Sequence, residues 1–185
     1  MLKEREAAML REYAAALDLA SFDRADTILD VATGSGRLLL QIVRRGYSVI
    51  SGDISEEALA KARERLGELS CKPCIVTLDA HHIQFEDASF RAVTLANAIH
   101  EMEAPASALD EMRRVLTADG KLLVIEFTPA GYELIALHHR LQGRPEHPTG
   151  EMRSEDIDRY LKAAFTRVES EVYEITQAWV AYGKR

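Results

Sequence analysis

The feature of this sequence that most constrains its fold is a regular alternation of short apolar runs with amphipathic segments. The apolar runs predict strands at residues 28–31, 48–51, 74–78, 92–96 and 122–127. The amphipathic segments predict helices at 37–45, 55–66 and 104–116. A turn is expected at 117–120. Strands that alternate with helices pair in parallel, so we expect an α/β sheet wound on both faces.

Both ends of the chain extend this alternating core. Met9, Tyr13 and Leu17 recur at four-residue spacing and predict an N-terminal amphipathic helix. Further helices are expected within 128–150 and from Ser154 onward. The last two apolar runs follow one another closely, which predicts an antiparallel hairpin. These runs lie at 167–175 and 177–182.

A chain of 185 residues without repeats or a Pro/Gly-rich linker is expected to form one domain with its own core. We divide it into a helical cap at 1–26, a core at 27–127, and a C-terminal part at 128–185. The C-terminal part is expected to hold a lid helix, a second helix and the final hairpin.

Polar residues stand where the predicted strands end. Asp30, Asp53, Asp79 and Asn97 each fall at or just beyond such an end. Right-handed crossovers bring the carboxyl ends of parallel strands to one edge of the sheet, where ligands bind. We therefore expect these side chains to surround one ligand.

A glycine loop lies between the first strand and the helix that follows it. Gly34 and Gly36 would let the backbone approach a ligand closely, and the helix N-terminus offers free N–H groups. A glycine pair in a turn is often only structural. Asp30 precedes Gly34 by four residues, and a carboxylate there suits a ligand with an ammonium group better than a pyrophosphate.

The run Asp30-Val31-Ala32-Thr33-Gly34-Ser35-Gly36 resembles the first motif of class I S-adenosylmethionine-dependent methyltransferases. It is most similar to the type 11 branch, which includes the quinone-biosynthesis C-methyltransferases. The resemblance covers residues 27–127 and implies a Rossmann-like, doubly wound, mostly parallel sheet. Ala32 stands where the family has its first glycine, a change that also occurs in the quinone-type branch. The loop would cradle the methionine part of the cofactor, with Asp30 near its amino end.

The same resemblance assigns roles to residues further along the chain. Asp53 would bind the ribose hydroxyls, and Ile54 would pack against the adenine face. Asp79 would accept a hydrogen bond from the adenine amine, with the Ala80 backbone beside the ring. Asn97 would contact the methionine part, through its backbone. The cofactor would be S-adenosylmethionine and the product S-adenosylhomocysteine.

The segment after the fourth predicted strand contains His100 and Glu101, the titratable residues that the resemblance places near the reacting sulfonium. The His100 imidazole could accept a proton from the methyl acceptor near neutral pH. The alternative is that His100 caps or packs the following helix. Methyl transfer is an in-line displacement, so positioning can supply most of the catalysis.

Charge and length exclude several functions. A net charge of −7, from 23 basic and 30 acidic residues, argues against binding a nucleic-acid backbone. The apolar runs fall far below the ~20 residues of a membrane span. The charged N-terminus lacks a signal-peptide core, so we expect a cytoplasmic protein.

The chain has few structural elements beyond the predicted core that could recognise a substrate, which favours a small molecule as the methyl acceptor. The oligomeric state is left open, a homodimer included.

No metal is expected. Cys71 and Cys74 precede a strand rather than open a helix, which favours reduced loop cysteines over a redox pair. His81 and His82 are adjacent in a loop and cannot easily reach one ion. His138 and His139 could bind a metal together with His147, but they fall where the spacing of apolar residues predicts a helix, which is the favoured interpretation. The apolar residues are Leu134, Ile135, Leu137 and Leu141.

Two rival functions remain from the sequence. A nicotinamide-dependent oxidoreductase would require a third glycine where Leu39 stands. A binding or regulatory module would keep the S-adenosylmethionine pocket without turnover.

Overall fold

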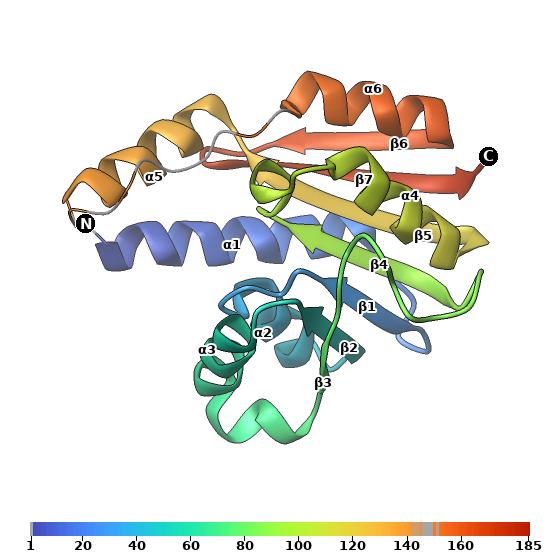
Figure 1. Cartoon of the computed structure of the whole chain (residues 1–185), viewed down its shortest axis with the longest axis horizontal. Coiled ribbons are helices and arrows are strands. Elements are labelled where there is room, and N and C mark those ends of the chain that lie inside the picture. The colour runs from blue at the N-terminus through green and yellow to red at the C-terminus, as the bar shows by residue number, and fades with distance from the viewer. Residues whose placement is uncertain (1, 142, 144, 146–149, 151) are drawn as a thin grey trace.

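A computed structural model describes residues 2–141, 143, 145, 150 and 152–185. Its centre is a seven-stranded sheet in the order β3-β2-β1-β4-β5-β7-β6 (Figure 1). The strands are β1 (Thr27–Val31), β2 (Ser48–Asp53), β3 (Cys74–Thr77), β4 (Phe90–Ala96), β5 (Leu116–Phe127), β6 (Phe165–Val172) and β7 (Thr176–Lys184). The first five pair in parallel, and β7 runs antiparallel to both β5 and β6. The predicted mostly parallel sheet with a C-terminal antiparallel hairpin is therefore confirmed.

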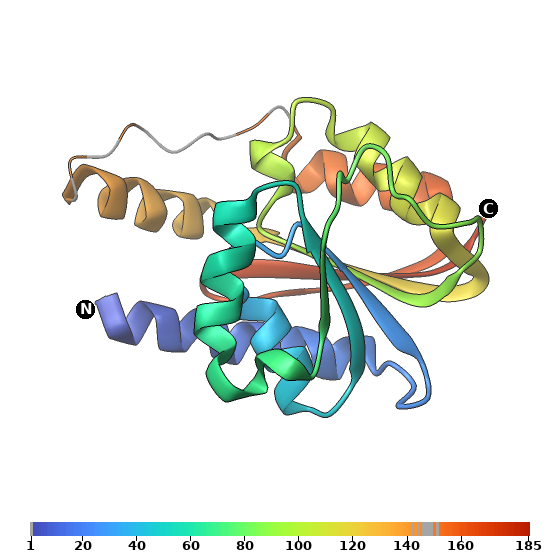
Figure 2. The ribbon, with the colours of Figure 1, turned by 60° about the horizontal axis from the view of Figure 1, so that its bottom comes forward.

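Helices cover both faces of this sheet. They are α1 (Leu2–Ala20), α2 (Arg37–Arg44), α3 (Glu56–Leu66), α4 (Pro105–Val115), α5 (Pro129–Leu141) and α6 (Ser154–Ala164). Short 3₁₀ turns lie at Gly67–Cys71 and Ile99–Glu101. Leucines and alanines of α1, α2 and α3 form one apolar core with the sheet, and those of α4 and α6 form another on the opposite face. Figure 2 shows these two layers with the sheet between them.

Local chemistry explains where several elements begin and end. Ser55 caps α3 by accepting a hydrogen bond at its Oγ from the Ala58 amide at 3.2 Å, as its position in the sequence predicts. Gly67, which follows α3, has a φ of 54°, a conformation that glycine adopts at little cost.

The sequence predicts a turn at residues 117–120 before the fifth strand, and this boundary is wrong. Strand β5 begins at Leu116, which is buried and pairs with Phe90, while the next pair joins Ala92 to Lys121. The turn-forming residues therefore make an irregularity within β5 instead of preceding it. Burial of Leu116 and its pairing with β4 outweigh the local turn preference.

Two helices project beyond the carboxyl edge of the parallel strands. Figures 1 and 2 show α5 and the first half of α1 there. A buried carboxylate fixes α1 in this position. Glu12 accepts hydrogen bonds from the Ile175 and Thr176 amides, at 3.0 and 2.8 Å, and from the Thr176 hydroxyl. The N-terminal helix is thereby attached to the turn between β6 and β7.

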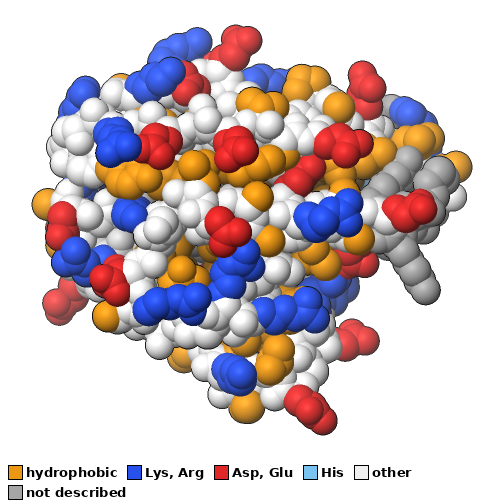
Figure 3. Space-filling model, turned by 180° about the vertical axis from the view of Figure 1, so that it is seen from behind, with side chains coloured by type: hydrophobic (Ala, Val, Ile, Leu, Met, Phe, Trp, Pro, Cys, Tyr) orange, Lys and Arg blue, Asp and Glu red, His pale blue; other side chains and the backbone are white. Residues whose placement is uncertain are grey.

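The face seen in Figure 3 carries acidic and basic side chains interspersed with apolar ones. Among the helices in the described part of the chain, none combines the length and apolar character needed to cross a bilayer.

Candidate functional site

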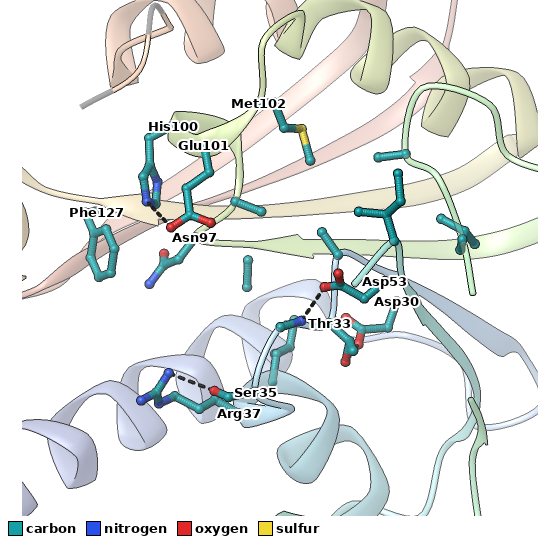
Figure 4. A pocket seen from close by; sticks show the side chains of 18 of the residues that line it. Asp30, Thr33, Ser35, Arg37, Asp53, Asn97, His100, Glu101, Met102 and Phe127 are labelled. Atoms are coloured by element: carbon teal, nitrogen blue, oxygen red, sulfur yellow. Dashed lines mark hydrogen bonds and ion pairs between the residues drawn. The ribbon is translucent and has the colours of Figure 1, made fainter. Parts of the chain in front are cut away.

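A cavity of about 680 Å³ opens at the carboxyl edge of the sheet, between the glycine loop, α1, α5 and the segment after β4 (Figure 4). Every residue that the sequence singles out for a ligand lines it, with the exception of Gly36. These residues are Asp30, Ala32, Thr33, Gly34, Asp53, Ile54, Asp79, Ala80, Asn97 and His100. Strand-end residues far apart in sequence therefore meet at one site.

The two glycines of the loop have different structural roles. Gly34 has a φ of 53°, and a Cβ built there would meet nothing within 4 Å. Gly36 has a φ of 74°, and its Cβ would lie 2.9 Å from the Ala62 Cα of α3. Gly34 thus leaves space at the cavity, whereas Gly36 lets α3 pack against the start of α2. Ala32 also has a positive φ, 54°, where an alanine is strained.

Asp30 lies on the cavity wall but is only 2% exposed. Its Oδ2 accepts hydrogen bonds from the Ser51 and Thr33 hydroxyls, at 2.7 and 2.9 Å, and its Oδ1 accepts one from Thr94 at 2.9 Å. Burial raises the pKa of Asp30, and the three hydroxyls oppose that rise. The carboxylate therefore ties the glycine loop to β2 and β4.

Asp53, at the end of β2, binds the glycine loop through its side chain. Its Oδ2 accepts a hydrogen bond from the Gly34 amide at 2.8 Å, and its Oδ1 accepts one from the Ser55 amide at 2.9 Å. The next residue, Ile54, is 69% exposed at the cavity. An isoleucine left open to water there offers an apolar surface to a flat ligand.

Asp79 and Ala80 line the cavity after β3, whereas Asn97 lines it after β4. The Asp79 Oδ1 accepts a hydrogen bond from the His81 amide at 2.9 Å. Asn97 has a φ of 49°, and both polar atoms of its amide are buried without a hydrogen-bond partner. A buried amide is costly to leave unsatisfied, so this side chain is a strong indication of a ligand. From the sequence we expect the Asn97 backbone to contact the cofactor. The structure shows that the Asn97 side chain also has polar atoms available to a ligand.

His100 is 2% exposed and touches the cavity at its upper end in Figure 4. Its Nδ1 lies 2.9 Å from the Oε1 of Glu126, which is itself fully buried in β5. Its Nε2 lies 3.8 Å from the Oε1 of Glu101. A carboxylate can only accept, so the contact with Glu126 places a proton on Nδ1. The helix-packing alternative for His100 accounts for its burial but not for this paired carboxylate.

Aromatic rings surround the His100 imidazole. The ring centroids of Phe127 and Tyr132 lie 5.4 and 5.5 Å from that of His100. Burial and the nearby charge of Glu126 raise the pKa of Tyr132, so this phenol stays protonated at neutral pH. Met102 and Ile135 add apolar side chains to the cavity lining, and the Glu101 carboxylate lies beside His100.

The charges of the cavity are strongly unequal. Five carboxylates line it, whereas Arg37 is the sole Lys or Arg among its described lining residues. The carboxylates belong to Asp30, Asp53, Asp79, Glu101 and Glu103. Such a cavity favours a ligand that carries positive charge, and it disfavours a pyrophosphate.

No three potential metal ligands gather within the described residues. His81 lies at the cavity beside Asp79, with its Nδ1 3.3 Å from the Asp79 Oδ1. In the other histidine group, His147 and the side chain of His138 lie outside the described residues. Cys71 and Cys74 are both free and exposed.

Among the residues that the sequence did not assign to the site are Arg37, which lines the cavity, and Glu126, which contacts His100. Glu126 interrupts an otherwise apolar strand, and a charge in a buried strand requires a partner. Arg37 places a cation at a helix N-terminus, which the helix dipole disfavours. Each departure from a local rule was a signal that could have identified the residue.

A family model described as a methyltransferase domain matches residues 29–124. A demethylmenaquinone methyltransferase of Thermus thermophilus is 35% identical over 134 residues, which are 71% of this chain and 61% of the relative. A ubiquinone/menaquinone biosynthesis C-methyltransferase, UbiE, of Geotalea uraniireducens is 34% identical over 121 residues, 60% of this chain and 50% of the relative. The chain therefore spans between half and two thirds of the length of these relatives.

Solved structures agree on the fold. A protein of Pyrococcus horikoshii OT3 superimposes with a TM-score of 0.75 at 22% identity, covering 94% of this chain and 91% of the other. A SAM-dependent methyltransferase of Aquifex aeolicus gives a TM-score of 0.68 at 21% identity, covering 93% and 89%.

Proposed function

The chain belongs to the family of methyltransferase domains, and from this premise we propose that it transfers a methyl group from S-adenosylmethionine to a small organic acceptor. The observation that carries the proposal is the charge of the cavity, where five carboxylates face a single guanidinium. S-adenosylmethionine carries two positive groups, a sulfonium and an ammonium, and one carboxylate. The charges of ligand and cavity are therefore complementary.

The shape of the cavity also suits this cofactor. Gly34 leaves open space beside the loop, and the unsatisfied amide of Asn97 offers both a donor and an acceptor. Ile54 offers an apolar face to the adenine, and Asp53 lies beside it for the ribose hydroxyls. A dinucleotide pyrophosphate would meet the same carboxylates with repulsion, which disfavours the oxidoreductase alternative.

The chain's own residues would orient the reactants. The bound cofactor supplies a methyl group already activated on a sulfonium. Asp53 and Asn97 would hold its two ends, while the glycine loop keeps its backbone close to the ligand. A fixed distance and angle between methyl group and acceptor lower the barrier without a covalent enzyme intermediate.

We propose that the Nε2 atom of His100 removes a proton from the methyl acceptor. Glu126 is then a positioning residue, because its bond to Nδ1 keeps the proton there and leaves Nε2 as the acceptor nitrogen. Glu126 is also held in place, since its Oε1 accepts a hydrogen bond from the Phe127 amide at 2.7 Å. A positive imidazole formed during the reaction would be stabilised by this buried carboxylate.

The apolar side chains near His100 indicate which class of molecule accepts the methyl group. Phe127, Met102 and Ile135 suit an aromatic or aliphatic molecule, and His100 suits one with an ionisable hydroxyl. Demethylated quinols, suggested by the names of the relatives, combine both features. We propose that α1 and α5 act as the cap and lid over this end, since Met9, Tyr13 and Ile135 line it.

The test is a screen of small acceptors for release of S-adenosylhomocysteine. Short-chain demethylated quinols are compared with phenols, amines and thiols. Turnover with one class, absent in an Asp53→Ala variant, would support the proposal. Tight binding of the cofactor without turnover by any class would favour the regulatory module instead.

A further inference from the structure

Arg37 stands apart from the other charged residues of the cavity. It is the sole Lys or Arg among the described lining residues, and it begins α2 directly after Gly36. A cation at a helix N-terminus meets the positive end of the helix dipole. Negative groups must therefore compensate for it, from the protein or from a ligand.

The protein supplies only part of that compensation. The Arg37 Nη1 donates a hydrogen bond to the Ser35 hydroxyl at 2.9 Å. The Arg37 Nε lies 3.6 Å from the Glu6 Oε1, is buried, and makes no hydrogen bond. The same Glu6 oxygen accepts a bond from the Arg65 Nη1 at 2.7 Å. One carboxylate thus serves two guanidinium groups, which leaves a surplus positive charge at the cavity.

The geometry places this charge at the end of the cavity away from the ribose site. Figure 4 shows Arg37 and Ser35 on one side of Thr33 and Asp53 on the other, with Asn97 across the cavity. A ligand whose ribose lies at Asp53 would extend over the glycine loop toward Arg37. The amide of Asn97, unpartnered and buried, faces the same stretch.

We propose that Arg37 binds the α-carboxylate of the cofactor's methionine part and selects S-adenosyl ligands that carry this group. The inference rests on the proposed function, since it assumes that the cofactor binds in this cavity. A guanidinium matches a carboxylate through charge-assisted hydrogen bonds, and the other charged groups that line the cavity are anionic or histidines. The free N–H groups at the start of α2 add to the attraction.

The test compares two ligands that differ only in this group, S-adenosylhomocysteine and its decarboxylated analogue, by calorimetric titration. The wild type should prefer S-adenosylhomocysteine by about 10- to 100-fold, as expected for a hydrogen bond to a charged group. Arg37→Met should bring the two affinities together, mainly by weakening S-adenosylhomocysteine, and Arg37→Lys should restore part of the preference. A ratio measured within one variant does not depend on how much of the protein is folded.

Arg65→Met is the matched control. Arg65 also contacts Glu6, and its Nε donates to the Ser35 carbonyl oxygen at 2.7 Å, yet it does not line the cavity. This variant should keep more of the preference than Arg37→Met does, because Arg37 remains at the cavity, although Glu6 is then left to Arg37 alone. The inference is overturned if Arg37→Met leaves the preference intact or weakens both ligands equally. Failure of the wild type to bind either ligand would instead overturn the proposed function.

Discussion

The two ends of the cavity are built in different ways. The end to which we assign the cofactor consists of loops that directly follow parallel strands, so residues such as Gly34, Asp53 and Asp79 meet because the strands lie side by side. The end to which we assign the acceptor is assembled from α1, α5 and the pair of His100 with Glu126, whose members belong to distant segments. The order of the parallel strands brings the residues of the first end together. The residues of the second end are brought together by packing between elements far apart in the sequence.

This difference predicts separable defects. Changes at the cofactor end should alter binding and stability together, because the loop is part of the sheet's edge. Changes at the acceptor end should alter methyl transfer while cofactor binding persists. The following variants test that separation, beginning with the largest expected effect.

Gly36→Val should cause the largest loss. The new side chain would collide with the Ala62 backbone and would require a φ of 74°, so we expect about 3 kcal/mol or more of destabilisation and no measurable cofactor binding. Denaturant unfolding and calorimetry measure the two effects.

Gly34→Val is the matched control for the same loop. Its side chain would enter open space, so the loss of stability should be smaller and come from the positive φ alone. Cofactor binding should still be lost, because the valine occupies the ligand's space. Equal destabilisation by the two variants would contradict the separate roles assigned to these glycines.

Glu126→Gln should separate catalysis from binding. We expect kcat to fall about 100-fold, the scale of general acid–base catalysis, with little change in cofactor affinity. The glutamine side chain can present either its carbonyl oxygen or its amide group to Nδ1, so it no longer fixes the His100 tautomer. The measurement is a pH profile of kcat for wild type, Glu126→Gln and His100→Ala. A defect confined to KM would argue against a positioning role.

Asp30→Asn should change how the stability of the protein without ligand depends on pH. Burial raises the pKa of Asp30 above its unfolded value, so the folded state binds the proton more tightly. Ionisation therefore costs stability as pH rises from the unfolded pKa, about 3.9, through the folded one. The stability of the variant relative to the wild type should therefore rise from acid to pH 8.

Unfolding of Asp30→Asn across pH checks the sign of this effect. A gain that appears only at low pH would contradict it. The variant should also bind the cofactor more weakly, because the ammonium group loses a nearby negative charge.

Ala32→Gly should have the smallest effect. Glycine relieves the strain of a φ of 54°, which stabilises the folded state by about 1–2 kcal/mol. It also increases the conformational entropy of the unfolded chain, which costs about 0.5–1 kcal/mol of stability. We expect a net stabilisation below about 1 kcal/mol and unchanged cofactor affinity, measured by thermal unfolding and calorimetry. A marked loss of affinity would show that the Ala32 methyl group contacts the ligand.

The sequence predicted the cofactor end better than the acceptor end for a physical reason. Asp30, Asp53 and Asn97 are marked by local signals, a polar residue where an apolar strand ends. Glu126 carries a weaker signal, since a charge in an apolar strand predicts a partner but only the contact with His100 shows which one. Leu116 shows the same limit in the fold, where pairing with Phe90 extends β5 through a predicted turn.

The central claim is that this cavity binds S-adenosylmethionine through the residues at the strand ends. Calorimetric titration of the wild type and of Asp53→Ala with S-adenosylmethionine tests it most directly. We predict saturable binding to the wild type that the substitution severely weakens. Absence of heat from the wild type at millimolar ligand, or equal binding by both proteins, would contradict the account.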